Sequence, residues 1–133
     1  MKDIYTPAIR ALVVAGLTLA TVTLMFVAVN TARAAGALAV GSCGAFGEAY
    51  DYRNVGKAEK VALEKCKGAA CRVATTVKRG CAAFAIDFVD PCSASGWGQG
   101  PELAGSQNAA LKACYGQGGK ECVIRTFFCD AKG

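Results

Sequence analysis

The sequence predicts an α+β domain made of two β-α-β halves, with one antiparallel sheet, both helices on one face of that sheet, and several disulfide bonds. Three observations predict this fold. A stretch of about fifty residues occurs twice, each time with an Ala-Leu-x-x-Cys motif. In each copy, apolar segments typical of strands flank a segment with helical periodicity. All eight cysteines lie beyond residue 34, in a part of the chain too short to bury a large core.

The first 34 residues have the features of a secretory signal peptide. Lys2 and Arg10 precede an uncharged run of 19 residues, 11–29, and Ala32-Arg33-Ala34 is the small-x-small pattern of a signal peptidase site. We expect cleavage after Ala34. The run is also long enough to span a bilayer, so an uncleaved membrane anchor is the alternative. In both cases residues 35–133 lie outside the cytoplasm, and an uncleaved leader is the only membrane contact that we expect.

The remaining 99 residues, 35–133, have the length of a single domain. They contain 12 basic and 9 acidic residues, so their net charge is only mildly positive. The lysines of the first predicted helix alternate with Glu59 and Glu64, which is typical of a solvated surface. We therefore expect no nucleic-acid partner.

The first repeat covers residues of about 36–81. A short apolar strand is predicted near 37–42. Asn54 is a suitable N-cap for a helix that runs to Cys66. The β-branched segment 71–77 then predicts a second strand.

The second repeat covers residues of about 82–129 and follows a turn at 78–80. Phe84, Ile86 and Phe88 alternate onto one face of a strand predicted over 81–89. A helix is predicted from Pro101-Glu102 to Cys114 or Tyr115, because proline is favoured in a first helical turn. The last strand is predicted over 121–129, and the glycine-rich segments 96–100 and 116–119 are interpreted as turns and a helix stop. The resulting order, β-α-β-β-α-β, is that of the ferredoxin-like arrangement.

The two motif copies resemble the bacterial DUF4189 domain family, which combines a Gly-Ala-x-Ala-type strand with two A-x-x-x-A-L-x-x-C segments, each followed by a C-x-V-type strand. The resemblance covers nearly all of residues 36–129. The first copy matches fully, and the second has Ser106 in place of the first alanine. The matching residues are Ala58, Ala62-Leu63, Cys66 and Cys71-Arg72-Val73, then Ala110-Leu111, Cys114 and Cys122-Val123-Ile124. The resemblance implies a small, exported, disulfide-rich domain without an agreed activity, in which Cys43 and Cys92 are additions to the usual cysteines.

An even number of cysteines in a small exported domain predicts a disulfide framework. In each half, one cysteine ends the helix and the next opens the following strand, which predicts the bonds Cys66–Cys71 and Cys114–Cys122. The other four pair either as Cys43–Cys81 with Cys92–Cys129, or as Cys43–Cys92 with Cys81–Cys129. The sequence leaves both schemes open. The full set is Cys43, Cys66, Cys71, Cys81, Cys92, Cys114, Cys122 and Cys129.

The chain has no histidine, which excludes Ser-His-Asp and Cys-His catalytic arrangements. The cysteine spacings do not match the usual zinc sites, and the glycine-rich segments lack the features of a phosphate-binding loop. We expect no metal, no cofactor and no catalytic residue. The acidic pairs Glu48/Asp51 and Asp87/Asp90 support one alternative, a hydrolase of cell-wall polymers, but acidic residues in such positions are more often turn residues.

Trp97, the only tryptophan, is the candidate binding residue, since tryptophan is enriched at binding hot spots. The competing interpretation is that Trp97 covers the core, as Phe46 would in the first half. We expect a periplasmic or secreted binding or accessory module whose partner is an envelope or extracellular protein. A purely structural or stress-resistance protein is the third alternative.

Overall fold

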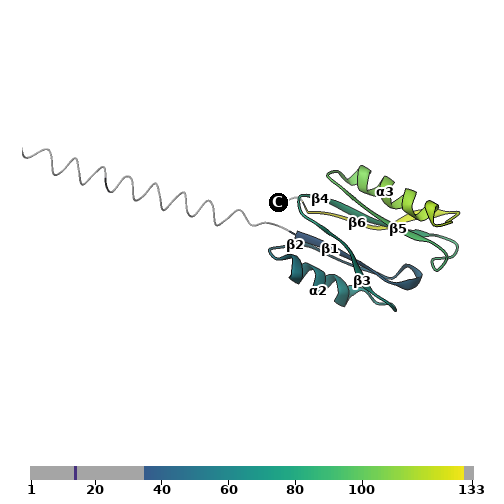
Figure 1. The fold of residues 1–133 in the computed structure, drawn as a ribbon, viewed down its shortest axis with the longest axis horizontal. Coiled ribbons are helices and arrows are strands. Elements are labelled where there is room, and N and C mark those ends of the chain that lie inside the picture. The colour runs from purple at the N-terminus through teal and green to yellow at the C-terminus, as the bar shows by residue number, and fades with distance from the viewer. Residues whose placement is uncertain (1–13, 15–34, 131–133) are drawn as a thin grey trace, which may run out of the picture. The chain divides into compact units, whose positions relative to one another are not determined.

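The computed structural model describes residue 14 and residues 35–130 (Figure 1). Six strands and two α-helices follow one another in this second range, together with a short 3-10 turn at Ser42–Gly44. The predicted leader lies outside the described residues, apart from residue 14. Among the described residues, no helix is long and apolar enough to span a membrane. The elements are β1 (Ala35–Val40), β2 (Phe46–Tyr52), α2 (Val55–Lys65), β3 (Arg72–Val77), β4 (Gly80–Asp87), β5 (Ser95–Gly100), α3 (Leu103–Gly116) and β6 (Cys122–Asp130).

The fold is α+β, as predicted, but the prediction of a single antiparallel sheet with both helices on one of its faces, the ferredoxin-like arrangement, is wrong, because each helix packs on a sheet of its own. The strands form two three-stranded antiparallel sheets, with the orders β2-β1-β3 and β5-β4-β6. The predicted turn at 78–80 therefore leads from one sheet to the other instead of closing a hairpin. Arg79 adopts a left-handed conformation there, with φ 54°.

Strands β2 and β5 are absent from the sequence prediction, which placed loops and turns in these segments. Both contain glycines, which are depleted in strands because they lack a side chain to pack. Here the missing side chain is what packing requires. A Cβ on Gly47 would lie 2.0 Å from the carbonyl oxygen of Ala62 in α2, and a Cβ on Gly96 would lie 2.3 Å from the amide nitrogen of Cys114 in α3. Each helix backbone therefore packs directly on a glycine of the strand.

The described domain has four layers, with α2 and α3 outside and the two sheets between them (Figure 1). The central strands β1 and β4 alternate small and large side chains. Their small residues face the helices: Ala37 and Ala39 pack with α2, and Ala83 and Ala85 pack with α3. The larger residues meet between the sheets, in a cluster that also contains one alanine: Leu38, Val77, Ala82, Phe84, Ile86 and Phe128. Phe84 is the largest of the fully buried side chains, at 1% exposure.

The two helices lie close to their predicted positions. Asn54 is the N-cap of α2, and its side chain accepts a hydrogen bond from the Lys57 N–H at 3.3 Å. Helix α3 begins at Leu103, directly after Pro101-Glu102. The prediction that Phe88 continues the buried face of its strand is wrong, because β4 ends at Asp87 and Phe88 is 69% exposed.

All eight cysteines are paired in the described part of the chain. The bonds Cys66–Cys71 and Cys114–Cys122 agree with the prediction and tie each helix to the strand that follows it. Of the two schemes left open, the structure has Cys43–Cys92 and Cys81–Cys129. These two bonds join the halves across 49 and 48 positions of sequence. In the loop-entropy model each one contributes roughly 4 kcal/mol of stability.

Candidate loop platform around Asp87

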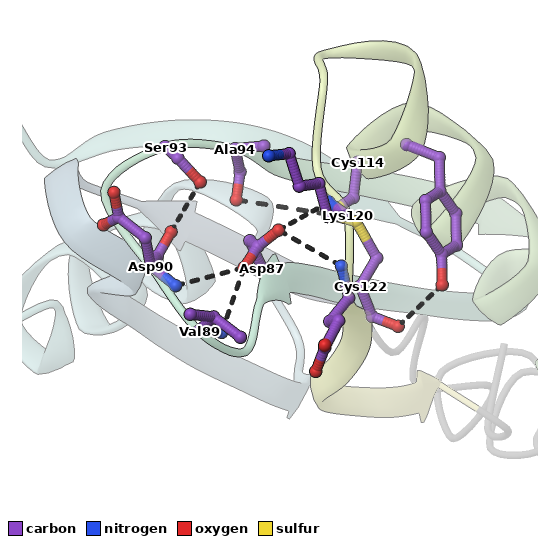
Figure 2. The surroundings of a disulfide bond; sticks show 10 residues. Asp87, Val89, Asp90, Ser93, Ala94, Cys114, Lys120 and Cys122 are labelled. Atoms are coloured by element: carbon purple, nitrogen blue, oxygen red, sulfur yellow. Dashed lines mark hydrogen bonds between the residues drawn. A yellow bond between two sulfur atoms is a disulfide. The ribbon is translucent and has the colours of Figure 1, made fainter.

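Asp87 is the last residue of β4 and is only 4% exposed. Its carboxylate accepts four backbone hydrogen bonds, two on each oxygen (Figure 2). Oδ1 accepts from Val89 and Asp90, both at 3.0 Å, and Oδ2 accepts from Lys120 at 2.6 Å and Glu121 at 3.2 Å. These N–H groups, that of Asp90 foremost, lower the pKa of Asp87 to about 2, although burial acts in the opposite direction.

Asp87 thereby connects two loops that strand β5 and helix α3 separate in the sequence. One is the β4–β5 loop, residues 88–94, and the other is the α3–β6 loop, residues 117–121. The amide of Phe88 also donates to the carbonyl of Glu121 at 2.9 Å, and that of Asp87 donates to Ala94 at 3.0 Å. We call residues 87–94 and 117–121 the loop platform.

The β4–β5 loop has further internal support. The Asp90 carboxylate accepts from the Cys92 amide at 3.0 Å, and the Ser93 hydroxyl donates to the Asp90 carbonyl at 2.7 Å. Cys92 is bonded to Cys43 in the other half of the domain. The loop is therefore fixed by side-chain hydrogen bonds, by a disulfide and by Asp87.

The α3–β6 loop is equally constrained. The Cys114–Cys122 bond closes it (Figure 2). Gly118 has a φ of 94°, which favours glycine, and Gly119 donates to the Cys114 carbonyl at 3.2 Å. The Tyr115 hydroxyl reaches the Cys122 carbonyl at 3.5 Å.

Apolar side chains project into solvent from this rigid base. Phe88 is 69% exposed and its neighbour Val89 is 71% exposed, the two largest values among the bulky apolar residues of 35–130. A cleft of about 370 Å³ adjoins Val89 and is lined by Asp87, Val89, Asp90, Ser93, Gly118, Lys120 and Glu121. The platform thus combines exposed apolar anchors with a polar cleft that carries charges of both signs.

The sequence-based prediction did not single out Phe88 and Val89 as exposed residues. A usable signal was present in Asp-Phe-Val-Asp-Pro, residues 87–91. Aspartate side chains bond backbone amides two or three residues further on, and proline ends a strand. Such a segment indicates a turn immediately after Asp87.

Trp97 lies on β5 at 39% exposure, so it is neither a fully buried core residue nor a strongly exposed anchor. It is paired with Phe84 of β4, and the residue that pairs with the equivalent Leu38 of β1 is Glu48. By strand register, Glu48 rather than Phe46 holds the position in the first sheet that Trp97 holds in the second.

The acidic residues considered for hydrolysis have separate structural roles. The carboxylate of Asp87 is used by four backbone amides, and its low pKa makes it unsuited to donate a proton as a general acid. Glu48 and Asp51 lie in β2 rather than in a loop. Glu48 accepts a hydrogen bond from the Thr126 hydroxyl of the opposite sheet, and Asp51 is exposed with a φ of 61°. Over residues 35–130 no three acidic or cysteine side chains are grouped as metal ligands would be.

Comparison with known proteins places the chain in a family. No curated protein matches the chain. The NMR structure of Rv1813c from Mycobacterium tuberculosis is similar, with a TM-score of 0.54 and 26% sequence identity, over 74% of this chain and 76% of that one. The family model described as a domain of unknown function, DUF4189, matches residues 35–129. This range contains both helices and all eight cysteines, and the chain belongs to the DUF4189 family.

Proposed function

We propose that this chain is an exported binding module that docks on another envelope or extracellular protein through Phe88 and Val89. The observation that carries the proposal is that two adjacent bulky apolar side chains are about 70% exposed on a loop that the fold holds in place. Contiguous exposed apolar surface on a small domain is typical of an interaction site.

The energetics favour this use of the loop. Burying a phenylalanine or valine side chain contributes roughly 1.5–3 kcal/mol each. A mobile loop would lose part of that gain because its backbone must be ordered on binding. Asp87 and the Cys43–Cys92 bond have already ordered residues 88–94 in the free protein. Most of the gain is therefore available for affinity.

The surroundings of the two side chains resemble the rim of a protein interface. Lys120, Glu121 and Asp90 line the cleft beside Val89 and supply charges of both signs. An apolar centre with a polar rim is the usual anatomy of such interfaces. The cleft of about 370 Å³ has room for a side chain of the partner.

The compartment belongs to the same proposal. Four disulfides in a domain of this size indicate an oxidising environment. Together with the signal-peptide pattern of residues 1–34, they support a periplasmic or secreted location.

Chemical cross-linking in the native cells tests the docking proposal. We compare three forms of the full, exported chain: wild type, Phe88→Ser with Val89→Ser, and the control Leu63→Ser. Leu63 is an apolar residue on α2 that is 38% exposed, so its replacement removes a comparable surface group away from the platform. We expect a defined cross-linked complex for wild type and the control, and its loss in the double variant.

Two results would contradict this proposal. A complex that survives the Phe88/Val89 change and is lost with Trp97→Ala would place the interface on β5. A chain that forms no defined complex in any form would favour the structural alternative.

We also propose that the two halves derive from a duplication. Both contain two strands, a helix and a strand, both sheets have the same strand order, and an irregularity occurs at the same place, after Leu38 in one and Phe84 in the other. Half-to-half alignment within each of many family sequences tests this, with an offset that stays between 46 and 51 positions as the expected result.

A further inference from the structure

Asp130, the last residue of β6, is completely buried, with 0% exposure. Among the described residues, no group makes a hydrogen bond of normal length and angle to either of its carboxylate oxygens, and the backbone N–H of Arg79 acts on the carboxylate only weakly. A buried carboxylate without a partner is strongly destabilising, so proteins pair such groups with a cation or keep them protonated. Within residues 35–130, Asp130 therefore lacks a partner that would neutralise its charge.

The charged groups near Asp130 on the described elements disfavour its ionised form further. Burial, and then the negative charge of Asp51 in β2, raise the pKa of Asp130, and the backbone N–H of Arg79 offsets this only in part. The side chains of Lys78 and Arg79 are exposed, and neither forms an ion pair within the described part of the chain. Two carboxylates from opposite sheets, Asp51 and Asp130, thus repel each other, and no cation of the described residues pairs with either.

The start of β1 lies beside Asp51 and close to the end of β6. Ala35 is 2% exposed and pairs with Tyr52, the residue after Asp51. Its neighbour Gly36 lies against β6, since a Cβ on Gly36 would be 2.5 Å from the Phe128 ring.

The strand register places Ala35, at the start of β1, near Asp130, at the end of β6. Phe128 and Asp130 point to the same side of β6, because residues two apart in a strand share a face. Gly36 pairs with Val77 and Asp130 pairs with Gly80, and only the turn 78–79 separates Val77 from Gly80. The beginning of β1 and the end of β6 therefore meet at this turn.

We infer that Asp130, with Asp51, is the binding site for the α-ammonium group of Ala35, which is created when the leader is cleaved after Ala34. Hydrolysis of that peptide bond adds hydroxyl to the Ala34 carbonyl carbon and hydrogen to the Ala35 nitrogen. The nitrogen, until then a neutral amide, becomes an amine that is protonated at neutral pH. It then offers three N–H donors and a positive charge to the carboxylates of Asp130 and Asp51.

Removal of the leader thus completes the fold. In the uncleaved chain no cation of the described residues pairs with the Asp130 carboxylate, whereas in the cleaved chain the new ammonium group neutralises it. The inference goes beyond the docking proposal and does not depend on it. It depends on cleavage after Ala34, which the experiment checks directly.

The experiment exports the full chain from its own leader, either unchanged or with one glycine inserted between Ala34 and Ala35. The insertion keeps a free ammonium group but displaces it by one residue. Intact mass establishes where each mature chain begins, and thermal unfolding gives Tm. Both forms are also made with Asp130→Asn, and with the control Glu59→Gln, which alters a carboxylate on α2.

We expect the unchanged chain to begin at Ala35, and the insertion to lower its Tm by at least about 5 °C, because one partner of a buried charge pair is displaced. Asp130→Asn should lower Tm in the chain that begins at Ala35. In the glycine-extended chain it should raise Tm, since it removes an unpaired charge. Glu59→Gln should leave the effect of the insertion unchanged.

Three results would overturn the inference: a mature chain that begins elsewhere or keeps its leader, equal Tm with and without the insertion, or an insertion effect that persists in Asp130→Asn. If Asp130→Asn does not fold, Asp51→Asn replaces it, and the insertion effect should then decrease.

Discussion

Packing of α3 directly on the backbone of β5 makes Gly96→Ala a sharp test of the four-layer architecture. The added Cβ would lie 2.3 Å from the Cys114 amide nitrogen and 2.7 Å from both the Ala110 carbonyl oxygen and the Ala113 carbonyl carbon. Ordinary contacts are longer by about 1 Å, and backbone atoms of a helix tied by a disulfide cannot rotate away. Overpacking costs about 1–3 kcal/mol, and we expect this substitution at the upper end.

A glycine-to-alanine substitution in the adjacent helix α3 serves as the matched control. A Cβ on Gly105 in α3 would meet nothing within 4 Å, so Gly105→Ala should gain about 1 kcal/mol from helix propensity. Thermal unfolding of the oxidised, exported chain should show Tm lowered by about 10–20 °C for Gly96→Ala and raised by about 4–8 °C for Gly105→Ala. Equal Tm values for Gly96→Ala and wild type would refute the packing of α3 on β5.

Further predictions concern the core, the platform and the bonds between halves. Phe84→Ala should cost about 3–5 kcal/mol in chemical unfolding, because Phe84 is fully buried between the sheets; a cost below about 1 kcal/mol would contradict the inter-sheet core. The lowered pKa of Asp87 means that its stabilisation is present above the unfolded pKa of about 3.9 and is lost as the pH falls toward 2. The Asp87→Asn variant should not show this loss of stability when its unfolding is measured at decreasing pH. A dependence of stability on pH identical to that of wild type would contradict the role of the carboxylate. Replacing Cys43 and Cys92 by alanine should cost up to about 4 kcal/mol and leave the other three bonds intact by peptide mapping; reshuffled bonds would show that the framework is not independent.

Helices, central strands and two disulfides followed directly from the sequence because their signals are local. Asn54 precedes a helical pattern, and the cysteines at 66 and 71 are close in the chain. The alternation of alanine with larger residues in β1 and β4 also indicates the four-layer arrangement, since the small residues face helices and the larger ones face the other sheet. This signal was present in the sequence and was interpreted only as strand periodicity.

The remainder depended on contacts distant in sequence. Gly96 and Gly47 indicate turns when considered alone, and only the approach of a helix explains them within strands. Phe88 continues the period of β4, but the amides that bind Asp87 come partly from residues 120 and 121, which no local pattern reveals. The burial of Asp130 depends in the same way on the packing of one half against the other.

The most direct test of the docking proposal is site-specific photo-cross-linking in the native cells. A photoreactive amino acid is placed at position 88 of the full, exported chain, and in a second version at position 63 on α2. The proposal predicts a defined protein adduct from position 88 that is absent from position 63. Absence of an adduct from position 88, or the same adducts from both positions, would contradict the assignment of Phe88 and Val89 as the binding surface.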